Sequence, residues 1–150
     1  MGTYALTGDD VIIINDIPVK DFVEGDIGTL ELPNTLFNMT TGKNGNTIFA
    51  YDESGNNATL TLRILLSSAD DKRFNGMIPE TKDFASTVLC TGSVVKQVGD
   101  GEGNISFNTY LLQGGLIHKK PNVKTNANGD TTQAVVEYVF QFARANRAIM

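Results

Sequence analysis

The sequence predicts a mainly β protein, an antiparallel β-sandwich or barrel subunit with one flanking α-helix. Three observations support this fold class. Many segments are rich in β-branched and aromatic residues, turn dipeptides punctuate the chain about every ten residues, and only the stretch after Ser68 has convincing helical spacing. A chain of 150 residues buries enough surface for one core, so we expect a single domain over 1–150.

Strands are expected over five ranges in the first half of the chain: 10–15, 19–23, 29–32, 47–51 and 58–66. Consecutive isoleucines at 12, 13 and 14 put apolar groups on both faces of the first strand, which predicts a central position in the sheet. Strict alternation over 58–66 turns its leucines and isoleucine to the core. Residues 38–46 are too polar to be buried, and they predict a long loop or an extended hairpin tip.

The expected helix begins at Ser68, whose hydroxyl suits an N-cap, with Asp70 and Asp71 at the positive end of the helix dipole. Its buried stripe has helical spacing and comprises Phe74, Met77, Ile78, Thr81 and Phe84. Because an internal proline breaks or kinks a helix, Pro79 predicts a kinked or two-part helix.

Three strand regions are expected in the second half, over 88–98, 104–114 and 133–142. The turn at 99–104, which contains three glycines, joins the first two of these strands in a hairpin. One face of the last strand is apolar and contains Val136, Tyr138, Phe140 and Phe142. Its other face is also partly apolar, as expected where a sheet packs on the core with one side and meets a neighbouring subunit with the other.

The residues that commonly carry chemistry have structural interpretations here. His118 is the only histidine and lies in a basic run, Cys90 lies in the middle of an apolar strand, and the first-turn position of Asp70 and Asp71 explains both carboxylates. The turn at 99–104 lacks the glycine and glutamate positions of nucleotide-binding and calcium-binding loops. We therefore predict no catalytic, metal-binding or cofactor-binding residues, no cofactor and no enzyme activity.

Charge and composition argue against two further classes, nucleic-acid-binding proteins and membrane-inserted proteins. The formal net charge of −5 argues against tight nucleic-acid binding, which depends on Lys and Arg neutralising phosphates. The apolar runs fall far short of the roughly 18 residues that cross a bilayer, so no membrane insertion is expected. A single cysteine and the lack of a signal-peptide pattern predict folding in a reducing cytoplasm.

Several short segments, each a turn or a cap when taken alone, follow one another in a distinctive order: Tyr4-x-Leu6-x-Gly8-x-Asp10-Val-Ile-Ile, Asp21-Phe-Val-Glu-Gly-Asp26, Thr41-Gly-Lys-Asn-Gly45, Leu62-Arg-Ile64 with Ser68-x-Asp70-Asp71-Lys72, Gly99-Asp-Gly-x-Gly-Asn104, Gly114-Gly115 and Gly129-Asp-Thr-x-Gln-Ala134. In this order and spacing, which extend over nearly the whole chain, the sequence resembles bacteriophage tail tube proteins, of the kind found in contractile-tailed phages.

The resemblance implies a structural virion protein that is assembled in the host cytoplasm and located in the tail. Six subunits would form a ring whose inner strands join into one β-barrel, and stacked rings would form the tube that conducts the genome. The implied partners are the tail sheath, the baseplate and the tail terminator. Inter-ring contact is expected from the 38–46 loop, through Thr41, Gly42, Lys43, Asn44, Gly45 and Asn46. An N-terminal arm over 1–8 and a C-terminal tail over 143–150 are the other segments expected to meet a neighbouring ring or the sheath.

The acidic balance has a physical role in such a tube. Carboxylates on the wall would repel DNA phosphates over about 8 Å at physiological salt, whereas Lys or Arg would hold the duplex and slow its passage. The residues expected to line the lumen are drawn from Asp21, Glu24, Asp26, Glu31 and Glu137.

Two alternatives stay open at this point. The first is the tube protein of a related injection machine, a phage-like bacteriocin or a type VI secretion system, which carries no genome. The second is a small ligand-binding or hydrolytic β domain, which predicts a monomer with a concave pocket and perturbed titratable groups.

Overall fold

The computed structural model describes residues 4–6, 10–23, 25, 27–79 and 87–149. The strands are β1 (Ala5–Leu6), β2 (Val11–Ile14), β3 (Ile17–Pro18), β4 (Gly28–Glu31), β5 (Phe37–Thr41), β6 (Thr47–Tyr51), β7 (Ala58–Leu65), β8 (Cys90–Gly99), β9 (Ile105–Lys119) and β10 (Val135–Ile149). The helices are α1 (Ala69–Asn75) and the short 3₁₀ helices η1 (Glu53–Asn56) and η3 (Thr131–Ala134). The fold is mainly β, as predicted.

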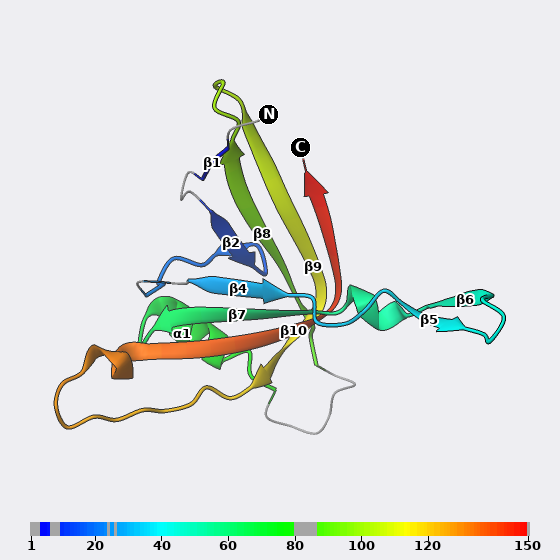
Figure 1. Cartoon of the computed structure of the whole chain (residues 1–150). Coiled ribbons are helices and arrows are strands. Elements are labelled where there is room, and N and C mark those ends of the chain that lie inside the picture. The colour runs from blue at the N-terminus through cyan, green and yellow to red at the C-terminus, as the bar shows by residue number, and fades with distance from the viewer. Residues whose placement is uncertain (1–3, 7–9, 24, 26, 80–86, 150) are drawn as a thin grey trace.

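One antiparallel sheet of eight strands forms the body, in the order β3-β2-β8-β9-β10-β7-β4, with β1 also paired to β8. Figure 1 shows its strong bend: β8, β9 and the end of β10 rise together, while β4, β7 and the start of β10 run across them. The long strand β10 therefore belongs to both halves of the bent sheet. Because the sheet folds over itself, the side chains on its concave side form the core.

A β-bulge lies at the bend. The register shifts between Cys90 and Gly92 of β8, where β9 has one more residue than β8 between paired positions. Gly114 lies at this point with φ +66°, in the left-handed region that glycine adopts without strain. Because the alternation is broken there, Phe142 and Ala145 of β10 are both buried although they are three residues apart.

The core follows the alternation that the sequence predicted. On β7, Leu60, Leu62 and Ile64 are each at most 1% exposed. Fully buried aromatic side chains meet them from β10 and α1, where the ring of Phe74 makes edge contacts with Tyr138 and Phe140 at centroid distances of 5.4 and 5.3 Å. Burial of this set supplies the main driving force for folding.

Helix α1 begins as predicted and ends earlier. The Ser68 hydroxyl accepts a hydrogen bond from the Asp71 amide at 3.2 Å, which is the expected N-cap. The helix ends at Asn75, where Gly76 is the C-cap, so it stops before Pro79 instead of bending there. Thr81 and Phe84, which were expected to extend the buried stripe, lie outside the described residues.

The carboxylate of Asp70, 7% exposed, joins α1 to the chain after β3. Its Oδ2 accepts hydrogen bonds from the backbone amides of Lys20 at 2.7 Å and Asp21 at 2.9 Å. In return, Asp21 Oδ2 accepts from the Asp70 amide at 3.2 Å, and Arg73 pairs with Asp70 at 3.5 Å. This reciprocal arrangement fixes the helix against the sheet.

The strands of the second half extend further than the sequence predicted. β9 continues to Lys119 and β10 to Ile149, so 143–149 is paired with β9 where a tail was expected. The prediction ended both strands early because the alternation fails at the bulge, and because residues after Phe142 are mostly small or polar.

Replacing Tyr138 with Phe is expected to remove a contribution to the free energy of unfolding that falls as the pH rises above 10. The Tyr138 hydroxyl donates to Asp71 Oδ1 at 2.5 Å, and burial, that hydrogen bond and the Asp71 charge all raise the pKa of Tyr138 above its ordinary value of about 10. Above pH 10 the unfolded chain therefore loses this proton while the native state keeps it. The free energy of unfolding falls with a slope approaching about 1.4 kcal/mol per pH unit from this group.

Urea unfolding of wild type and Tyr138→Phe between pH 8 and 11 measures this contribution. We expect the difference between the two proteins to shrink as the pH rises above 10, whereas the exposed control Tyr51→Phe keeps a constant offset. A pH-independent difference for Tyr138→Phe would contradict the assignment.

Candidate assembly surfaces

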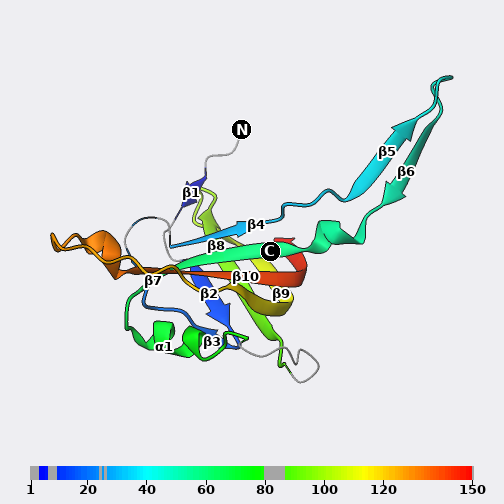
Figure 2. The same cartoon turned by 90° about the horizontal axis from the view of Figure 1, so that it is seen from below.

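The hairpin β5–β6 extends away from the body and forms its own two-stranded sheet. We name residues 37–51 the arm. Figures 1 and 2 show the arm standing clear of the larger sheet, and every residue of both of its strands is exposed. Its two ends meet at the body, where the Asp52 amide donates to the Leu36 carbonyl at 2.8 Å. The arm therefore contributes nothing to the core of its own subunit.

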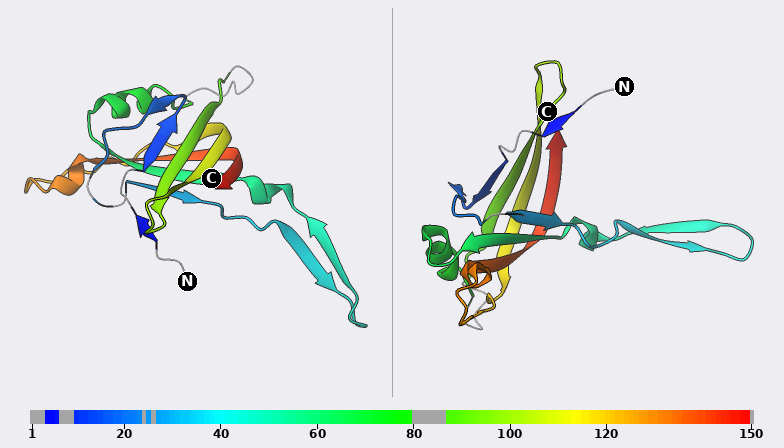
Figure 3. Two further views of the ribbon diagram at one scale, coloured as in Figure 1. Left: turned by 90° about the horizontal axis from the view of Figure 1, so that it is seen from above. Right: turned by 60° about the vertical axis from the view of Figure 1, so that its left-hand side comes forward.

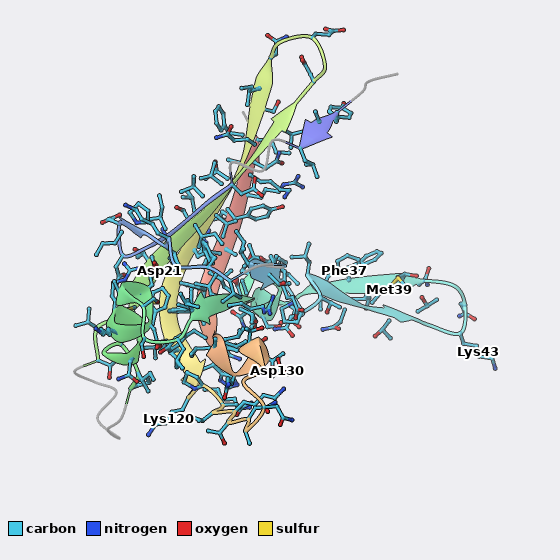
Figure 4. The ribbon with its side chains drawn as sticks, turned by 90° about the vertical axis from the view of Figure 1, so that its left-hand side faces the viewer. Asp21, Phe37, Met39, Lys43, Lys120 and Asp130 are labelled. Carbon is cyan, nitrogen blue, oxygen red and sulfur yellow. The ribbon has the colours of Figure 1, made fainter. Side chains whose placement is uncertain are left out.

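One face of the arm is apolar. Phe37 pairs with Tyr51 and Met39 with Phe49 across the two strands, which puts all four side chains on the same face. They are between 51% and 65% exposed, and the rings of Phe37 and Phe49 make an edge contact at 5.4 Å. Figure 4 shows Phe37 and Met39 on the arm, with Lys43 at its tip. An exposed apolar surface of this kind marks an interaction site.

The tip of the arm brings together the residues that the sequence singled out for inter-ring contact, Thr41 to Asn46. The Gly42 amide donates to the Asn46 carbonyl at 2.7 Å, and Gly45 adopts φ +86° in the turn. Of the long loop and the extended hairpin tip that the sequence predicts for 38–46, the structure has the hairpin, with 38–41 in strand β5. The apolar face was missed, although alternate apolar residues at 37 and 39 are a strand signal.

The base of the arm is closely packed. A side chain at Gly55 of η1 would meet the Thr35 carbonyl at 2.7 Å and Leu36 at 2.8 Å. Asp52 caps η1 by accepting from the side chain and amide of Ser54, and these two hydrogen bonds lower the pKa of its carboxyl. The base of the arm is therefore well ordered, which favours one defined orientation of the arm relative to the body.

Helix α1 contributes Phe74 to the core on the concave side of the sheet, and in the described part of the chain no helix covers the convex side of β4, β7 and the first half of β10. We name this surface the outer face. The register puts ten residues on it: Thr29, Glu31, Thr59, Thr61, Arg63, Leu65, Val135, Glu137, Val139 and Gln141. Four of them carry a hydroxyl or an amide, three are apolar and three are charged, and the charged pair Arg63 and Glu137 lies 4.0 Å apart.

The acidic residues predicted for the lumen fall in different places. Glu31 and Glu137 share the outer face. Asp21 lies against α1, where its carboxylate accepts the Asp70 amide. Glu24 and Asp26 lie outside the described residues.

Within the described ranges, part of the sheet edge is unpaired along β10. Residues 144–149 pair with β9 on one side, whereas β7 pairs only with the strand up to Phe142. Exposed apolar side chains lie around this end of the sheet, on Leu6, Ile105, Phe107, Leu111 and Ile149. Figure 3 shows this end standing beyond the region where the sheet folds over itself. A long unpaired strand edge with apolar neighbours is a surface that other chains can extend.

The described residues contain no group of three His, Cys, Asp or Glu side chains positioned to hold a metal ion. Cys90 is buried, and desolvation raises the pKa of its thiol, which keeps it protonated and poorly reactive. His118 is exposed at the end of β9. Among the helices of the described ranges, none has the length and hydropathy needed to span a bilayer.

No protein-family model and no curated protein matches the chain. Solved structures match along nearly its whole length. A chain from the sheath/tube terminator of an extracellular contractile injection system, PVC, in the extended state has a TM-score of 0.64 at 12% identity, covering 95% of this chain and 94% of that one. A chain from the tube-terminating cap of the anti-feeding prophage has a TM-score of 0.64 at 9% identity, covering 96% and 90%.

A chain from the sheath-tube complex of the same PVC system has a TM-score of 0.62 at 10% identity, covering 94% of this chain and 88% of that one. At these identities the likeness concerns the fold. The predicted tail-tube-like fold is confirmed: this chain has the fold of chains found in the sheath-tube complex, the sheath/tube terminator and the tube-terminating cap of contractile injection particles.

Proposed function

We propose that this protein is a structural subunit of the tube of a contractile tail or injection particle, and that it assembles with itself into hexameric rings that stack. The observation that carries this proposal is the arm. It exposes Phe37, Met39, Phe49 and Tyr51 on one face and makes no contribution to its own core. Burying this face against another copy would remove the apolar surface from water.

Ring formation is supported by the shape of the sheet. Strand β10 leaves an edge over 144–149 without a partner in the bent sheet, and β4 is an edge strand. Joining edges between copies would close the sheets into a barrel, which abolishes the exposed edges that lead to aggregation.

The outer face suits a tube wall. Its part around β4 is formed by Thr29, Glu31, Thr59, Thr61 and Gln141, which supply hydroxyls, one amide and one carboxylate and no cation. A wall without a surplus of cations would not add counterion-release affinity for DNA, so a duplex would pass without adhering. On this proposal Glu31 lines the lumen, with Glu24 and Asp26 as further candidates, and Asp21 serves helix docking instead. Glu137 lies at the border of the wall, where the outer face meets Lys119, Lys120 and Lys124.

The proposal has two versions, a phage tail tube that conducts a genome and the tube of an injection particle that carries none. The order of sequence motifs resembles phage tail tubes that conduct a genome, with a sheath, a baseplate and a terminator as partners. The solved structures of like fold come from PVC and anti-feeding prophage particles. Isolation of the native particle separates the two versions, since a phage tail carries a DNA-filled capsid and an injection particle does not.

Replacing residues 37–51 with Asn-Gly tests the role of the arm. The hydrogen bond between Asp52 and Leu36 already holds the two ends together, so a two-residue turn spans them. We expect a folded protein whose free energy of unfolding changes by less than about 1 kcal/mol, because the arm contacts no core residue. Sedimentation velocity at increasing concentration should show that stacking is lost, and polymers as long as those of wild type would overturn the assignment.

A further inference from the structure

A basic groove lies on an otherwise acidic protein. It has a volume of about 830 Å³ and lies between β7, β10 and the chain that follows β9, where it overlaps the outer face at Arg63, Glu137 and Val139. Its apolar lining includes Phe22, Leu65, Val135 and Val139. Three lysines line it as well, Lys119, Lys120 and Lys124, together with Arg63, and Glu137 is the carboxylate among its lining residues.

The three lysines are exposed and unpaired. No ion pair within the described parts of the chain involves Lys119, Lys120 or Lys124, and the ion pairs that do form use other cations. Arg63 is 4.0 Å from Glu137, so the lysines are the surplus positive charge of the groove. A surface with an apolar floor and a basic rim fits an occupant with apolar flanks and acidic ends.

The molecule has such a segment. We name residues 99–104, which join β8 to β9, the tip. It contains Asp100 and Glu102 and no cation. The Asp100 carboxylate organises the turn by accepting from the amides of Glu102 at 2.7 Å and Asn104 at 3.1 Å, and Glu102 is exposed. Glycines at 99, 101 and 103 keep the tip narrow enough to enter a groove.

Apolar side chains flank the tip. Ile105 and Phe107 at the start of β9 are 53% and 40% exposed, and Leu6 of β1, across β8 from them, is 72% exposed. The tip therefore has the complementary pattern, with carboxylates at its end and apolar groups at its sides. The arm projects as well, but its one charged residue is Lys43, which the lysines of the groove would repel.

The tip and the groove lie at opposite ends of β9. This strand runs for 15 residues from Ile105 beside the tip to Lys119 in the groove, about 50 Å if it were straight. Figures 1 and 4 show the two ends far apart, with Lys120 at the end away from the tip. A contact between them must therefore join two molecules, and such a head-to-tail contact generates a closed ring when its rotation closes.

We propose that the acidic tip of one copy docks in the basic groove of the next copy around the ring, with Glu102 meeting Lys120 and Lys124. This inference rests on the proposed self-assembly and specifies its lateral contact. Because the contact is mainly between opposite charges at a rim, it weakens at high salt.

Charge reversal tests the pairing in the full-length protein. We expect Glu102→Lys and Lys120→Glu each to raise the concentration for half-maximal assembly about tenfold or more, as measured by sedimentation velocity in low salt. The double variant should recover to within about threefold of wild type. The matched control Lys72→Glu, on the exposed side of α1, should leave assembly unchanged.

Disulfide trapping is a second test of the contact between the tip and the groove, and it does not depend on charge. Glu102→Cys combined with Lys120→Cys should yield a ladder of linked oligomers on oxidation, and neither single variant should. Cys90 is buried and does not interfere. Assembly like wild type with no ladder and no effect of charge reversal would overturn the tip–groove contact but not the tube proposal. An effect of Lys120→Glu that Glu102→Lys neither shares nor rescues would assign the groove to another partner and also overturn it.

Discussion

Asp70→Ala is expected to lower the free energy of unfolding by about 3–5 kcal/mol, because it breaks a buried charged cluster from one side. The amides of Lys20 and Asp21 would lose their acceptor, and Arg73 would lose its counter-charge. Arg73 has little to replace it, since its Nε and Nη2 are buried without hydrogen-bond partners. Urea unfolding at a protein concentration too low for assembly measures the effect.

Asp130→Ala is the matched control. Asp130 also accepts a backbone hydrogen bond, from Thr132 at 3.0 Å, but it is exposed and caps only the short helix η3. Its removal should cost no more than about 1 kcal/mol. Equal effects of the two substitutions would mean that the buried cluster does not hold α1 to the sheet.

Phe49→Asp is expected to abolish stacking while leaving the subunit folded. Phe49 lies on the apolar face of the arm opposite Met39, and it is 63% exposed in the single subunit. Burying an unpaired carboxylate in a contact between copies would cost several kcal/mol, which raises the stacking concentration by at least a hundredfold. The unfolding curve should not move, because the side chain contacts nothing in the body.

Thr40→Asp adds the same charge at a neighbouring position on the opposite face of the arm. It should raise the stacking concentration by less than tenfold, since only the face with Phe37, Met39, Phe49 and Tyr51 is proposed to be buried. Loss of stacking in both variants to the same extent would show that charge on the arm matters rather than its apolar face.

Residue periodicity and turn and cap preferences predicted those parts of the fold that depend on a single strand, helix cap or turn. The alternation of β7, the Ser68 cap of α1 and the turn at 99–104 all appear where expected. Each depends on residues close together in sequence, so propensity and periodicity are sufficient to find it.

Features that depend on distant residues were not predictable. The ends of β9 and β10 were missed because the bulge at Gly114 breaks the alternation across neighbouring strands. The apolar face of the arm was missed because the arm has no core to pack against, so the polar residues of 38–46 decided the prediction of a long loop or an extended hairpin tip. The basic groove was missed because it combines Arg63, Lys119 and Lys124 from separate parts of the chain.

Negative-stain electron microscopy of the concentrated purified protein tests the central claim most directly, that this chain builds a tube from copies of itself. The predicted result is six-fold rings or tubes of uniform diameter for wild type, and unstacked particles when residues 37–51 are replaced by Asn-Gly. A wild-type protein that stays monomeric at high concentration, with its arm exposed, would contradict the claim.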